Sequence, residues 1–574
     1  MNTEVSVAAG ADALETEVLI VGLGPVGATL ANLLGRYGVS VLVVDQSTEI
    51  FTKPRAIALD NEALRILQSA GVKPGEFSTV GIPSVQYHSP LFGRFARVNS
   101  ARIVDCHPTL VTFYQPELEE LLRRKLKGLP SVTVSLGVKL ESLEEVDGGV
   151  LSRLRSADGS SRQVQSRYLV GADGASSTVR NLLGLDFKGE TFPQDWLIVD
   201  ATDVDKPIDH IEFLCDPRRP TPHMVAPGNR QRWEFMLHPG EDPAVMEHPD
   251  TIHRLLAPWC DSRRIRIERT AVYRFHAREA ATFSEGRCFL VGDAAHVTPP
   301  FAGQGLVAGL RDVINLGWKL AWVLRRGADS AILSTYDEER RPHARRIINL
   351  ALLLGRLVMP RNRLTAFLLH GMVRAARLTP PGRAMFDDLK IKPDNRFDEG
   401  LFWRQGPTQR LTAGSTFPQG WVQTPFSNTP ALSDDVLGDG LALIGFGVDP
   451  ASALEPDLLA RWNAAGGRIS QWCHRGQSLH LAPPGRRIEA LDENVLPQRV
   501  PIGWAAIVRP DRCVMAEGPI DSASQLVSGA LGRIRATPGT RSPAPPVANR
   551  NRVPRGTTPG STQSAAESVR NVAY

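Results

Sequence analysis

Short apolar runs that end at glycine or at a charged residue recur along the first half of the chain, and this pattern is typical of buried strands followed by tight turns. These runs cover residues 17–22, 40–44, 167–172 and 287–292, and stretches at helical spacing follow the first and the last of them, at 25–37 and 303–325. Small residues in the first helix, among them Gly27 and Ala31, allow it to approach a sheet closely. We therefore expect the four runs to lie in one largely parallel sheet.

The remaining pattern predicts three further regions. Residues of about 190 to 285 alternate between apolar and polar positions, which is typical of antiparallel strands. After Pro342 the chain is helical and apolar to about Leu378, where prolines interrupt the pattern. Strand candidates at 441–445 and 504–508 flank a helical stretch at 456–465, so a small α/β domain is expected near the C-terminus.

Composition and charge exclude several classes of protein. The 574 residues are 42% apolar and 22% charged, enough for more than one globular domain. Between Arg533 and the C-terminus lie seven arginines and one acidic residue, so this tail carries +6, the whole chain has a formal net charge of +5, and the body is about neutral. Nucleic-acid binding is therefore not expected, and the tail, rich in Pro, Ser, Thr and Gly, is expected to be disordered.

The cysteines and the N-terminus indicate a cytoplasmic protein. The six cysteines form no Cys-x-x-Cys pair, which fits reduced thiols and offers no metal site. No basic residue precedes Arg36, whereas a secretory signal needs one. The longest apolar run, 347–359, is interrupted by Asn349 and Arg356 and falls short of the ~20 residues that span a bilayer, so a packed helix is favoured over a membrane-surface role.

A glycine motif joins the first strand to its helix. Gly22-Leu-Gly24-Pro25-Val-Gly27 permits a tight turn and lets the backbone approach a pyrophosphate at the helix N-terminus. Asp45 ends the second strand 18 residues beyond Gly27, in position to accept hydrogen bonds from a ribose. The pattern predicts dinucleotide binding but does not choose between NAD and FAD.

Two later stretches carry further motifs: Gly292-Asp293-Ala-Ala-His296-Val-Thr-Pro299-Pro300-Phe-Ala-Gly303-Gln-Gly305-Leu306 and Gly171-Ala-Asp173-Gly174-Ala-Ser-Ser-Thr-Val-Arg180. They resemble the Gly-Asp motif and the Asp-Gly motif of one family, the FAD-dependent aromatic-ring hydroxylases. Pro54-Arg55-Ala56 and Gln115 match its early arginine segment and its flavin-contacting glutamine. The four motifs occur in the family's order between about residues 17 and 345.

The resemblance implies a fold class that combines α/β and α+β parts. It consists of a Rossmann-like FAD-binding domain, a mostly antiparallel substrate domain and a C-terminal thioredoxin-like domain. The boundaries that we expect are 1–15 for a flexible N-terminus, 16–190 and 286–400 for the FAD-binding domain, 191–285 for the substrate sheet, 410–528 for the thioredoxin-like domain and 532–574 for the disordered tail. Cys473 and Cys513 lie far apart, so a packing or dimer-interface role is favoured over redox activity in that last domain.

The resemblance also implies the cofactors. FAD would be reduced by NADH or NADPH, with Asp173 and Arg180 associated with both cofactors, and one oxygen atom of O₂ would be transferred to a phenol. The expected cofactor-binding residues are Gly22, Gly24, Pro25, Gly27, Asp45, Arg55, Gln115, Asp173, Gly174, Arg180, Gly292, Asp293, Pro299, Gly303, Gly305 and Leu306. Two positions depart from the family: Val307 replaces a common asparagine, and Asp45 replaces the usual glutamate.

Within the family, several stretches are most similar to members that hydroxylate meta-hydroxylated phenylpropanoid acids to catechols. They include residues 54–65, 215–220 and 232–236. A carboxylate side chain favours an arginine anchor, and the middle region offers Arg232, Arg218, Arg219, His223 and Tyr273 as candidates, each of which could instead be a surface charge or an ion-pair partner. His296 is a candidate base for the phenol, and a structural role within its motif is the alternative.

Other functions stay open from the sequence alone. Hydroxylation of a different phenol, or a non-hydroxylating flavin oxidase or halogenase, would use the same scaffold, although the tryptophan-rich motif typical of flavin halogenases is absent. A nucleotide-sensing protein would have no use for the Gly-Asp motif. The expected partners are a small phenolic acid and O₂, without nucleic acid or stable membrane insertion, and the oligomeric state is left open between a monomer and a homodimer.

Overall fold

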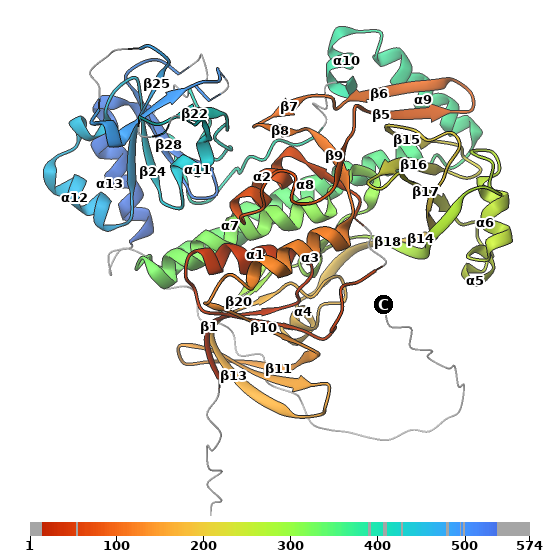
Figure 1. The fold of residues 1–574 in the computed structure, drawn as a ribbon, viewed down its shortest axis with the longest axis horizontal. Helices are drawn as coiled ribbons and strands as arrows, with labels where there is room; N and C mark the ends of the chain where they lie inside the picture. The colour runs from red at the N-terminus through yellow and green to blue at the C-terminus, as the bar shows by residue number, and fades with distance from the viewer. Residues whose placement is uncertain are drawn as a thin grey trace, which may run out of the picture.

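The computed structural model describes residues 14–52, 56–387, 392–405, 410–425, 427, 429–477, 482–493, 495–496 and 500–535. Three sheet-containing regions surround a long central helix, α7 (Gly305–Arg325) (Figure 1). The predicted position of Arg55, the first 13 residues and the tail beyond residue 535 lie outside the described residues.

The first sheet contains all four apolar runs, as predicted. Its strands β10 (Val132–Leu136), β2 (Val41–Asp45), β1 (Leu14–Val21) and β13 (Ser161–Gly171) are parallel neighbours in that order, and β20 (Cys288–Leu290) joins parallel to the end of β13. The antiparallel strands β12 (Gly149–Ser156) and β11 (Val138–Val146) extend the sheet beyond β13, and β19 (Ser284–Glu285) pairs with β20.

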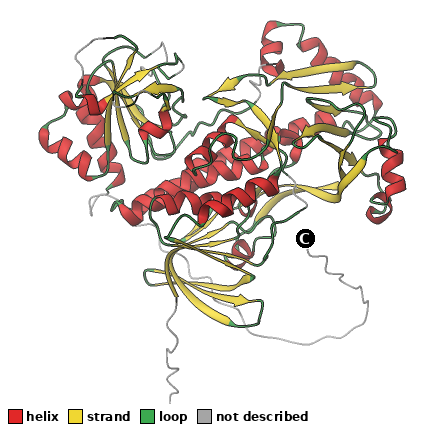
Figure 2. Ribbon diagram, in the orientation of Figure 1, coloured by secondary structure: helices red, strands yellow, loops and turns green. Residues whose placement is uncertain are grey.

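Helices cover this sheet in a closely packed layer (Figure 2). Helix α1 (Pro25–Arg36) contacts both α7 and α3 (Gln115–Leu126). A Cβ atom at Gly309 of α7 would lie 2.7 Å from the Val26 Cγ2 atom of α1, so glycine sets the close approach of these two helices. The region is completed by short elements: β3 (Ala58–Asp60), α2 (Asn61–Ser69), β4 (Thr79–Gly81), β7 (Ile103–Val104), β8 (His107–Pro108), β9 (Leu110–Phe113) and α4 (Thr178–Leu182).

The second sheet is antiparallel over residues 187–280, as the alternating pattern predicts. Its order is β21 (His296–Val297), β18 (Arg266–Ala280), β14 (Phe187–Thr202), β17 (Arg230–Met236), β16 (Thr221–Ala226), β15 (Ile211–Leu214), β5 (Ser84–Ser89) and β6 (Gly93–Asn99). Strands β5 and β6 lie outside the alternating pattern of residues 190–285 from which this sheet is predicted. β5 pairs parallel with β15, a contact between residues more than 120 positions apart, which local patterning does not reveal.

Helices lie on the two faces of the second sheet. Leu197 and Trp233 pack in one cluster with residues of α5 (Pro243–Met246) and α6 (Pro249–Leu256). On the other face, Trp196 packs in a cluster with residues of α8 (Thr335–Val358) and α9 (Arg363–Ala376). α10 (Pro380–Asp387) follows, so the prolines that interrupt the apolar pattern begin a new helix, where their fixed φ is tolerated.

The C-terminal region forms a separate mixed sheet. β24 (Ala442–Phe446), α12 (Pro456–Ala464) and β25 (Arg468–His474) form a parallel unit, and β27 (Trp504–Val508), β28 (Val514–Pro519) and α13 (Ala523–Ile534) follow, with β27 antiparallel to both β24 and β28. This arrangement agrees with the expected thioredoxin-like fold. The edge is formed by β26 (Arg487–Ala490), β22 (Trp421–Gln423) and β23 (Ala431–Leu432), next to α11 (Ser433–Leu437).

Buried ion pairs join this domain to the rest of the molecule. Arg65 of α2 contacts Asp434 at 2.7 Å, and Arg509 contacts Glu339 of α8 at 2.7 Å. Both side chains of each pair are almost fully buried, so the two pairs lie inside the interface between this domain and the rest of the molecule. The six cysteines are free thiols. Among the described residues, no helix combines the length and hydrophobicity needed to cross a bilayer.

Candidate functional site

Motifs from distant parts of the sequence meet at the carboxyl edge of the first sheet. In the strand register, Val21 lies beside both Val44 and Gly171, and Gly171 lies beside Leu290. The loops that follow these strands therefore leave the sheet at one edge. They carry the glycine motif, Asp45, the Asp-Gly motif and the Gly-Asp motif. The carboxyl edge is also the edge at which α/β sheets bind ligands.

The three motif glycines have different roles in this geometry. Gly22 has a φ of +105°, and a Cβ there would lie 2.4 Å from the Ala172 carbonyl oxygen. A Cβ at Gly27 would lie 2.1 Å from the Gly22 carbonyl oxygen. Gly24, by contrast, precedes α1, and a Cβ there would meet no atom within 4 Å beyond its chain neighbours, so it borders open space at the helix N-terminus. The chain thus leaves room for a pyrophosphate where the motif predicts one.

Asp45 fixes the loop that it faces. Its Oδ2 accepts a hydrogen bond from the Leu23 N–H at 2.7 Å, and its Oδ1 accepts one from the Ser47 N–H at 2.8 Å. A carboxylate has about four lone-pair positions, so two remain for sugar hydroxyls. The half-buried Asp45 therefore fits the predicted ribose contact despite being shorter than glutamate.

Helix α3 adds a residue that the sequence analysis missed. Gln115 begins this helix, and one turn later Glu119 and Arg123 form an ion pair at 2.7 Å. The Arg123 Nη2 also donates to the Leu23 carbonyl oxygen at 3.2 Å, which brings a cation beside the glycine loop. Burial raises the pKa of the Glu119 carboxyl. The spacing of Glu119 and Arg123 by four residues was the available signal.

The Asp-Gly motif is built around a clamp. The Asp173 carboxylate accepts hydrogen bonds from the Ser177 hydroxyl and from the Thr178 and Val179 N–H groups, which fixes the start of α4. Arg180 donates to the carbonyl oxygens of Ala294 (2.9 Å) and Ala175 (2.8 Å). Arg180 therefore ties the Asp-Gly loop to the Gly-Asp loop.

A buried ionic cluster holds the Gly-Asp motif from the other side. The Asp312 Oδ2 atom of α7 accepts from the Gly292 N–H at 3.0 Å and contacts the His296 Nε2 at 2.7 Å, and Oδ1 accepts from Arg340 at 2.9 Å. His296 and Arg340 hold the pKa of the Asp312 carboxyl below its usual range. His296 is 1% exposed, so this geometry favours the structural alternative for it. Asp293 lies half-buried in the turn that follows Gly292.

The start of α7 is positioned by a second ionic cluster that sequence reasoning missed. Asp60 at the start of α2 accepts hydrogen bonds from Gln304, Arg311 and Lys392 at 3.2, 3.1 and 2.8 Å. The Gln304 side-chain oxygen in turn accepts from Arg311 at 2.9 Å. Because the Gln304 side chain is engaged in this way, it does not cap α7. The first N–H groups of α7, at Gly305, Leu306 and Val307, therefore remain for a ligand. Because these donors belong to the backbone, a ligand can bind them without a polar side chain at position 307, where the Val307 side chain is fully buried.

The second sheet presents an aromatic cluster next to these motifs, which we call the aromatic face. Phe301, directly after Pro299 and Pro300, lies edge-on to Trp196 (5.9 Å between ring centres) and to Phe275 (6.0 Å). Trp196 and Phe275 are stacked at 5.4 Å, and Phe192 contacts Phe301 at 6.0 Å. Within the described residues, the fully buried Trp196 indole N–H has no hydrogen-bond partner.

Only some of the substrate-binding candidates share the aromatic face. Tyr273 is the cross-strand neighbour of Trp196, and Arg232 is paired with Asp200, four positions from Trp196 on the same side of β14. His223 lies opposite Trp233, stacks on it at 4.5 Å and faces α6. The structure therefore brings Arg232 and Tyr273 together and separates His223 from them.

The arginine candidates already have acidic partners. Arg232 contacts Asp200 through two hydrogen bonds, at 2.6 and 3.0 Å, and Arg269 contacts Asp200 at 3.0 Å. Burial raises the pKa of the neighbouring Glu234 carboxyl to about 6. Arg218 is 68% exposed and pairs with Asp216 at the surface. Arg219 pairs with Glu241.

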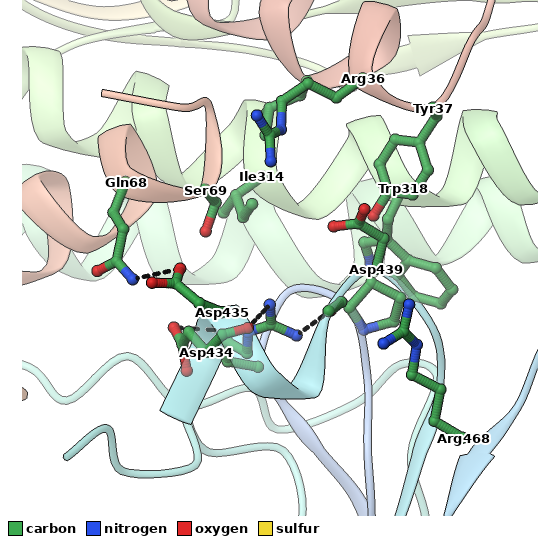
Figure 3. Close-up of a pocket in the computed structure, with 14 residues that line it drawn as sticks. Arg36, Tyr37, Gln68, Ser69, Ile314, Trp318, Asp434, Asp435, Asp439 and Arg468 are labelled. Carbon is green, nitrogen blue, oxygen red and sulfur yellow. Dashed lines mark hydrogen bonds and ion pairs between the residues drawn. The ribbon is translucent and has the colours of Figure 1, made fainter. Parts of the chain in front are cut away.

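A cavity lies away from these motifs, where α1, α2 and α7 face the C-terminal domain (Figure 3). It has a volume of about 350 Å³ and is lined by charged groups that include Arg36, Asp439 and Arg468. Gln68 spans part of the interface with a 3.0 Å hydrogen bond to Asp435. No residue of the four motifs lines this cavity.

Family models match most of the chain. A model described as "FAD binding domain" matches residues 15–351, and one described as "HcaD C-terminal domain" matches residues 414–532.

Curated relatives and solved structures resemble the chain over most of its length. It is 37% identical over 521 residues (88% of this chain, 93% of the relative) to the 3-(3-hydroxy-phenyl)propionate/3-hydroxycinnamic acid hydroxylase 2 of Burkholderia vietnamiensis (strain G4 / LMG 22486). It is 35% identical over 543 residues (91% and 92%) to a protein of Mycobacterium sp. (strain KMS) named 3-(3-hydroxy-phenyl)propionate/3-hydroxycinnamic acid hydroxylase.

Two solved structures share the fold. The flavin-dependent monooxygenase PieE, in complex with FAD and substrate, has a TM-score of 0.73 at 22% identity, with 90% of this chain and 98% of that chain covered. Aklavinone-11 hydroxylase, with FAD and aklavinone, has a TM-score of 0.70 at 24% identity, with 91% and 99% covered.

Proposed function

The chain belongs to the FAD-dependent aromatic-ring hydroxylases, and from this premise we propose that it uses NADH or NADPH and O₂ to hydroxylate 3-(3-hydroxyphenyl)propanoate and 3-hydroxycinnamate. The products would be the 2,3-dihydroxy catechols, as expected of an enzyme that degrades aromatic compounds. The relatives' names support this substrate class. The observation that carries the proposal is the meeting of the dinucleotide motifs at one sheet edge, beside the aromatic face.

The carboxyl edge of the first sheet fits FAD. The open space at Gly24 would accept the pyrophosphate, Asp45 would accept hydrogen bonds from the ribose, Asp293 would accept them from the ribityl chain, and the uncapped start of α7 would donate to the flavin ring. Gln115, Asp173, Gly174 and Arg180 complete the proposed set. FAD bound there supplies electron transfer from the nicotinamide and the transfer of one oxygen atom of O₂ to the substrate.

The aromatic face would orient the phenolic ring and exclude water. Its rings offer flat apolar contacts, and the unpartnered Trp196 N–H offers one donor to a bound substrate. Pro299 and Pro300, directly before Phe301, would stiffen the backbone beside the aromatic face, and prolines lack N–H groups.

Arg232 is our proposed anchor for the substrate carboxylate, with Tyr273 beside it. Both lie on the aromatic face, and Arg232 and Arg269 together place two guanidinium groups around one fully ionised carboxylate, Asp200. With Glu234 ionised, the two guanidinium groups and the two carboxylates balance; protonation of Glu234, whose pKa is raised to about 6, leaves a positive charge that favours a substrate anion. The alternative is that Arg232 serves only the Asp200 ion pair.

The phenol must lose its proton for efficient attack on an electrophile, because its pKa is near ~10. His296 was the candidate base. Its contact with Asp312 supports a positioning role instead, in which it holds Gly292 and α7 in register. We propose this positioning role and keep general-base catalysis by His296 as the alternative.

A screen of NADH consumption tests the proposed function. The purified protein should be yellow, and 3-(3-hydroxyphenyl)propanoate and 3-hydroxycinnamate should accelerate NADH or NADPH oxidation and yield catechols by chromatography. Catechol formation only from other phenols would show that the proposed substrate is wrong and that the enzyme hydroxylates a different phenol. NADH oxidation that yields hydrogen peroxide without hydroxylated product would indicate an oxidase.

A further inference from the structure

Helix α9 exposes apolar side chains on the side that faces away from the protein. Leu364, Phe367, Leu368 and Met372 are 67%, 52%, 60% and 62% exposed. They recur at helical spacing, so they form one stripe along the helix. The opposite side of α9 is also apolar and packs inward through Ala366 and Val373.

Neighbouring residues widen this stripe into a patch. Leu378, after α9, is 76% exposed, and Leu91, in the turn between β5 and β6, is 52% exposed. Phe92 of that turn contacts Phe367 at 5.4 Å between ring centres. We call these residues, together with the four of the stripe, the α9 patch. The helices α9 and α10 and the strands β5 and β6 lie together at one end of the molecule, away from the C-terminal domain (Figure 1). A contiguous apolar surface of this kind marks an interaction site.

The charge around the patch is mainly positive. Residues 361–386 contain five arginines and no aspartate, glutamate or lysine. Arg361, Arg363 and Arg374 are exposed on or next to α9, and the Arg374 guanidinium lies 5.8 Å from the centre of the Phe92 ring. The acidic groups near this surface are Asp216, which interacts with Arg363, and Asp387, which pairs with Arg377. Arg361 and Arg374 form no such ion pair among the described contacts.

We propose that the α9 patch docks on the surface of an anionic lipid bilayer, with α9 lying in the plane of the interface. An apolar stripe flanked by arginines is the combination that binds such surfaces, because apolar burial and attraction to anionic headgroups act together. This inference is independent of the proposed substrate. It adds a surface attachment to a protein in which no described helix crosses a membrane.

Other occupants fit the charge less well. A two-fold dimer through this surface would bring the arginines of one copy against those of the other. The chain beyond residue 535 carries five arginines and one glutamate, and it contains no Leu, Ile, Phe, Met or Trp, so it matches neither the charge nor the apolar character of the patch.

Vesicle flotation of the full-length holoenzyme tests the proposal. We compare vesicles of phosphatidylcholine alone with vesicles that contain phosphatidylglycerol as well. The wild-type protein should float with the anionic vesicles, bind the neutral ones several-fold less, and dissociate as salt shortens the range of the charge interaction.

Two double variants separate the apolar and charged contributions. Leu364→Ser with Leu368→Ser should lower binding to anionic vesicles about tenfold or more, because two exposed leucines no longer insert. Arg361→Gln with Arg374→Gln should lower it about 25-fold, since each surface arginine contributes roughly fivefold. The matched control is Ile103→Ser with Ile502→Ser, two aliphatic residues that are 76% and 57% exposed outside the patch. The control should bind as the wild type does, and all three should keep FAD and turnover.

Several outcomes would overturn the proposal. One is wild-type protein that stays unbound with anionic vesicles at low salt. Another is equal loss of binding in the control and the patch variants. A third is a wild-type dimer in sedimentation analysis that Leu364→Ser with Leu368→Ser converts to a monomer, because a second copy would then cover the patch.

Discussion

The carboxyl edge of the first sheet and the aromatic face of the second sheet are built in different ways. At the edge, backbone geometry sets the site: Gly22 and Gly27 admit neighbouring carbonyl oxygens, and Gly24 borders open space. On the aromatic face, side chains from three strands set it, and its arginines are tied to a carboxylate.

The difference explains what each region can tolerate. The edge keeps its shape through close backbone contacts, so a substitution can block the ligand without disturbing the fold. On the aromatic face the same groups are proposed to hold the substrate and to satisfy buried charge. Substitutions there should change stability and binding together.

The largest effect is expected on the aromatic face. Arg232→Ala should leave Asp200 with Arg269 alone and lower the free energy of unfolding by about 3 kcal/mol, the lower end for a broken buried pair. It should also raise the KM for 3-(3-hydroxyphenyl)propanoate sharply and change little for a neutral meta-substituted phenol. Denaturant titration and paired KM measurements check this.

The exposed Arg218 offers the control, and Arg218→Ala should leave stability and both KM values near those of the wild type. If Arg232→Ala raises the KM equally for the acid and the neutral phenol, its role is structural only.

At the edge, Gly24→Val should remove FAD but not the fold. The extended backbone of Gly24 admits a side chain, and no protein atom obstructs it, so the valine would occupy the proposed pyrophosphate position. FAD affinity should fall about a hundredfold, with unchanged thermal unfolding of the apoprotein. Absorbance of bound flavin measures this. A folded Gly24→Val protein with stoichiometric FAD would contradict the assignment.

The pH dependence of stability tests the charge cluster on the second sheet. Glu234 has a folded-state pKa of about 6, above its ordinary value of 4.5. Between these values the folded protein holds a proton that the unfolded chain has lost, so this group lowers the free energy of unfolding as pH rises through that window. Glu234→Gln should therefore gain ~2 kcal/mol relative to the wild type between pH 4 and pH 7.

Exposed Glu144 provides the comparison for that measurement. Glu144→Gln should follow the wild-type pH profile. A Glu234→Gln profile parallel to that of the wild type would show that Glu234 titrates normally.

Arg180→Ala should have a smaller effect, at the edge. It removes the bridge to the Ala294 and Ala175 carbonyl oxygens but no group that we place on the pyrophosphate. FAD should stay bound, and flavin reduction by NADH should slow about tenfold through loss of loop alignment. Arg180→Lys keeps the charge without bridging both carbonyl groups and should resemble Arg180→Ala. If rapid-mixing experiments show flavin reduction at the wild-type rate in Arg180→Ala, Arg180 has no role in that step.

The smallest effect is expected from the tail. Residues from Gly532 onward are rich in Pro, Ser, Thr, Gly and Arg, so a chain that stops at Arg535 should keep FAD and turnover. Stopping there retains all of α13, whose Ile534 is buried. Loss of folding in this variant would show that the tail docks on the body.

The residues at the carboxyl edge of the first sheet could be predicted because each motif there is defined by residues close together in the sequence. Each motif joins a strand to a turn within a few residues, so Gly22, Asp45 and Asp293 could be placed without knowledge of the rest of the fold. The parallel order of the strands then brings the motifs together.

The parts that sequence reasoning missed depend on distant partners. Arg232 contacts Asp200 across 32 positions, and Gln304 contacts Asp60 across 244. The face on which His223 lies was also hidden, because strand register decides it. The sequence identified Arg232 and His223 as candidates but did not show what they contact.

We propose that this edge and this face together hydroxylate a phenylpropanoid acid. Isotope labelling tests it most directly: the holoenzyme is given NADH, 3-(3-hydroxyphenyl)propanoate and ¹⁸O₂, and the product is analysed by mass spectrometry. We expect 3-(2,3-dihydroxyphenyl)propanoate with one ¹⁸O atom, formed as NADH is consumed. NADH consumption that returns the acid unlabelled, with hydrogen peroxide as the oxygen product, would contradict it.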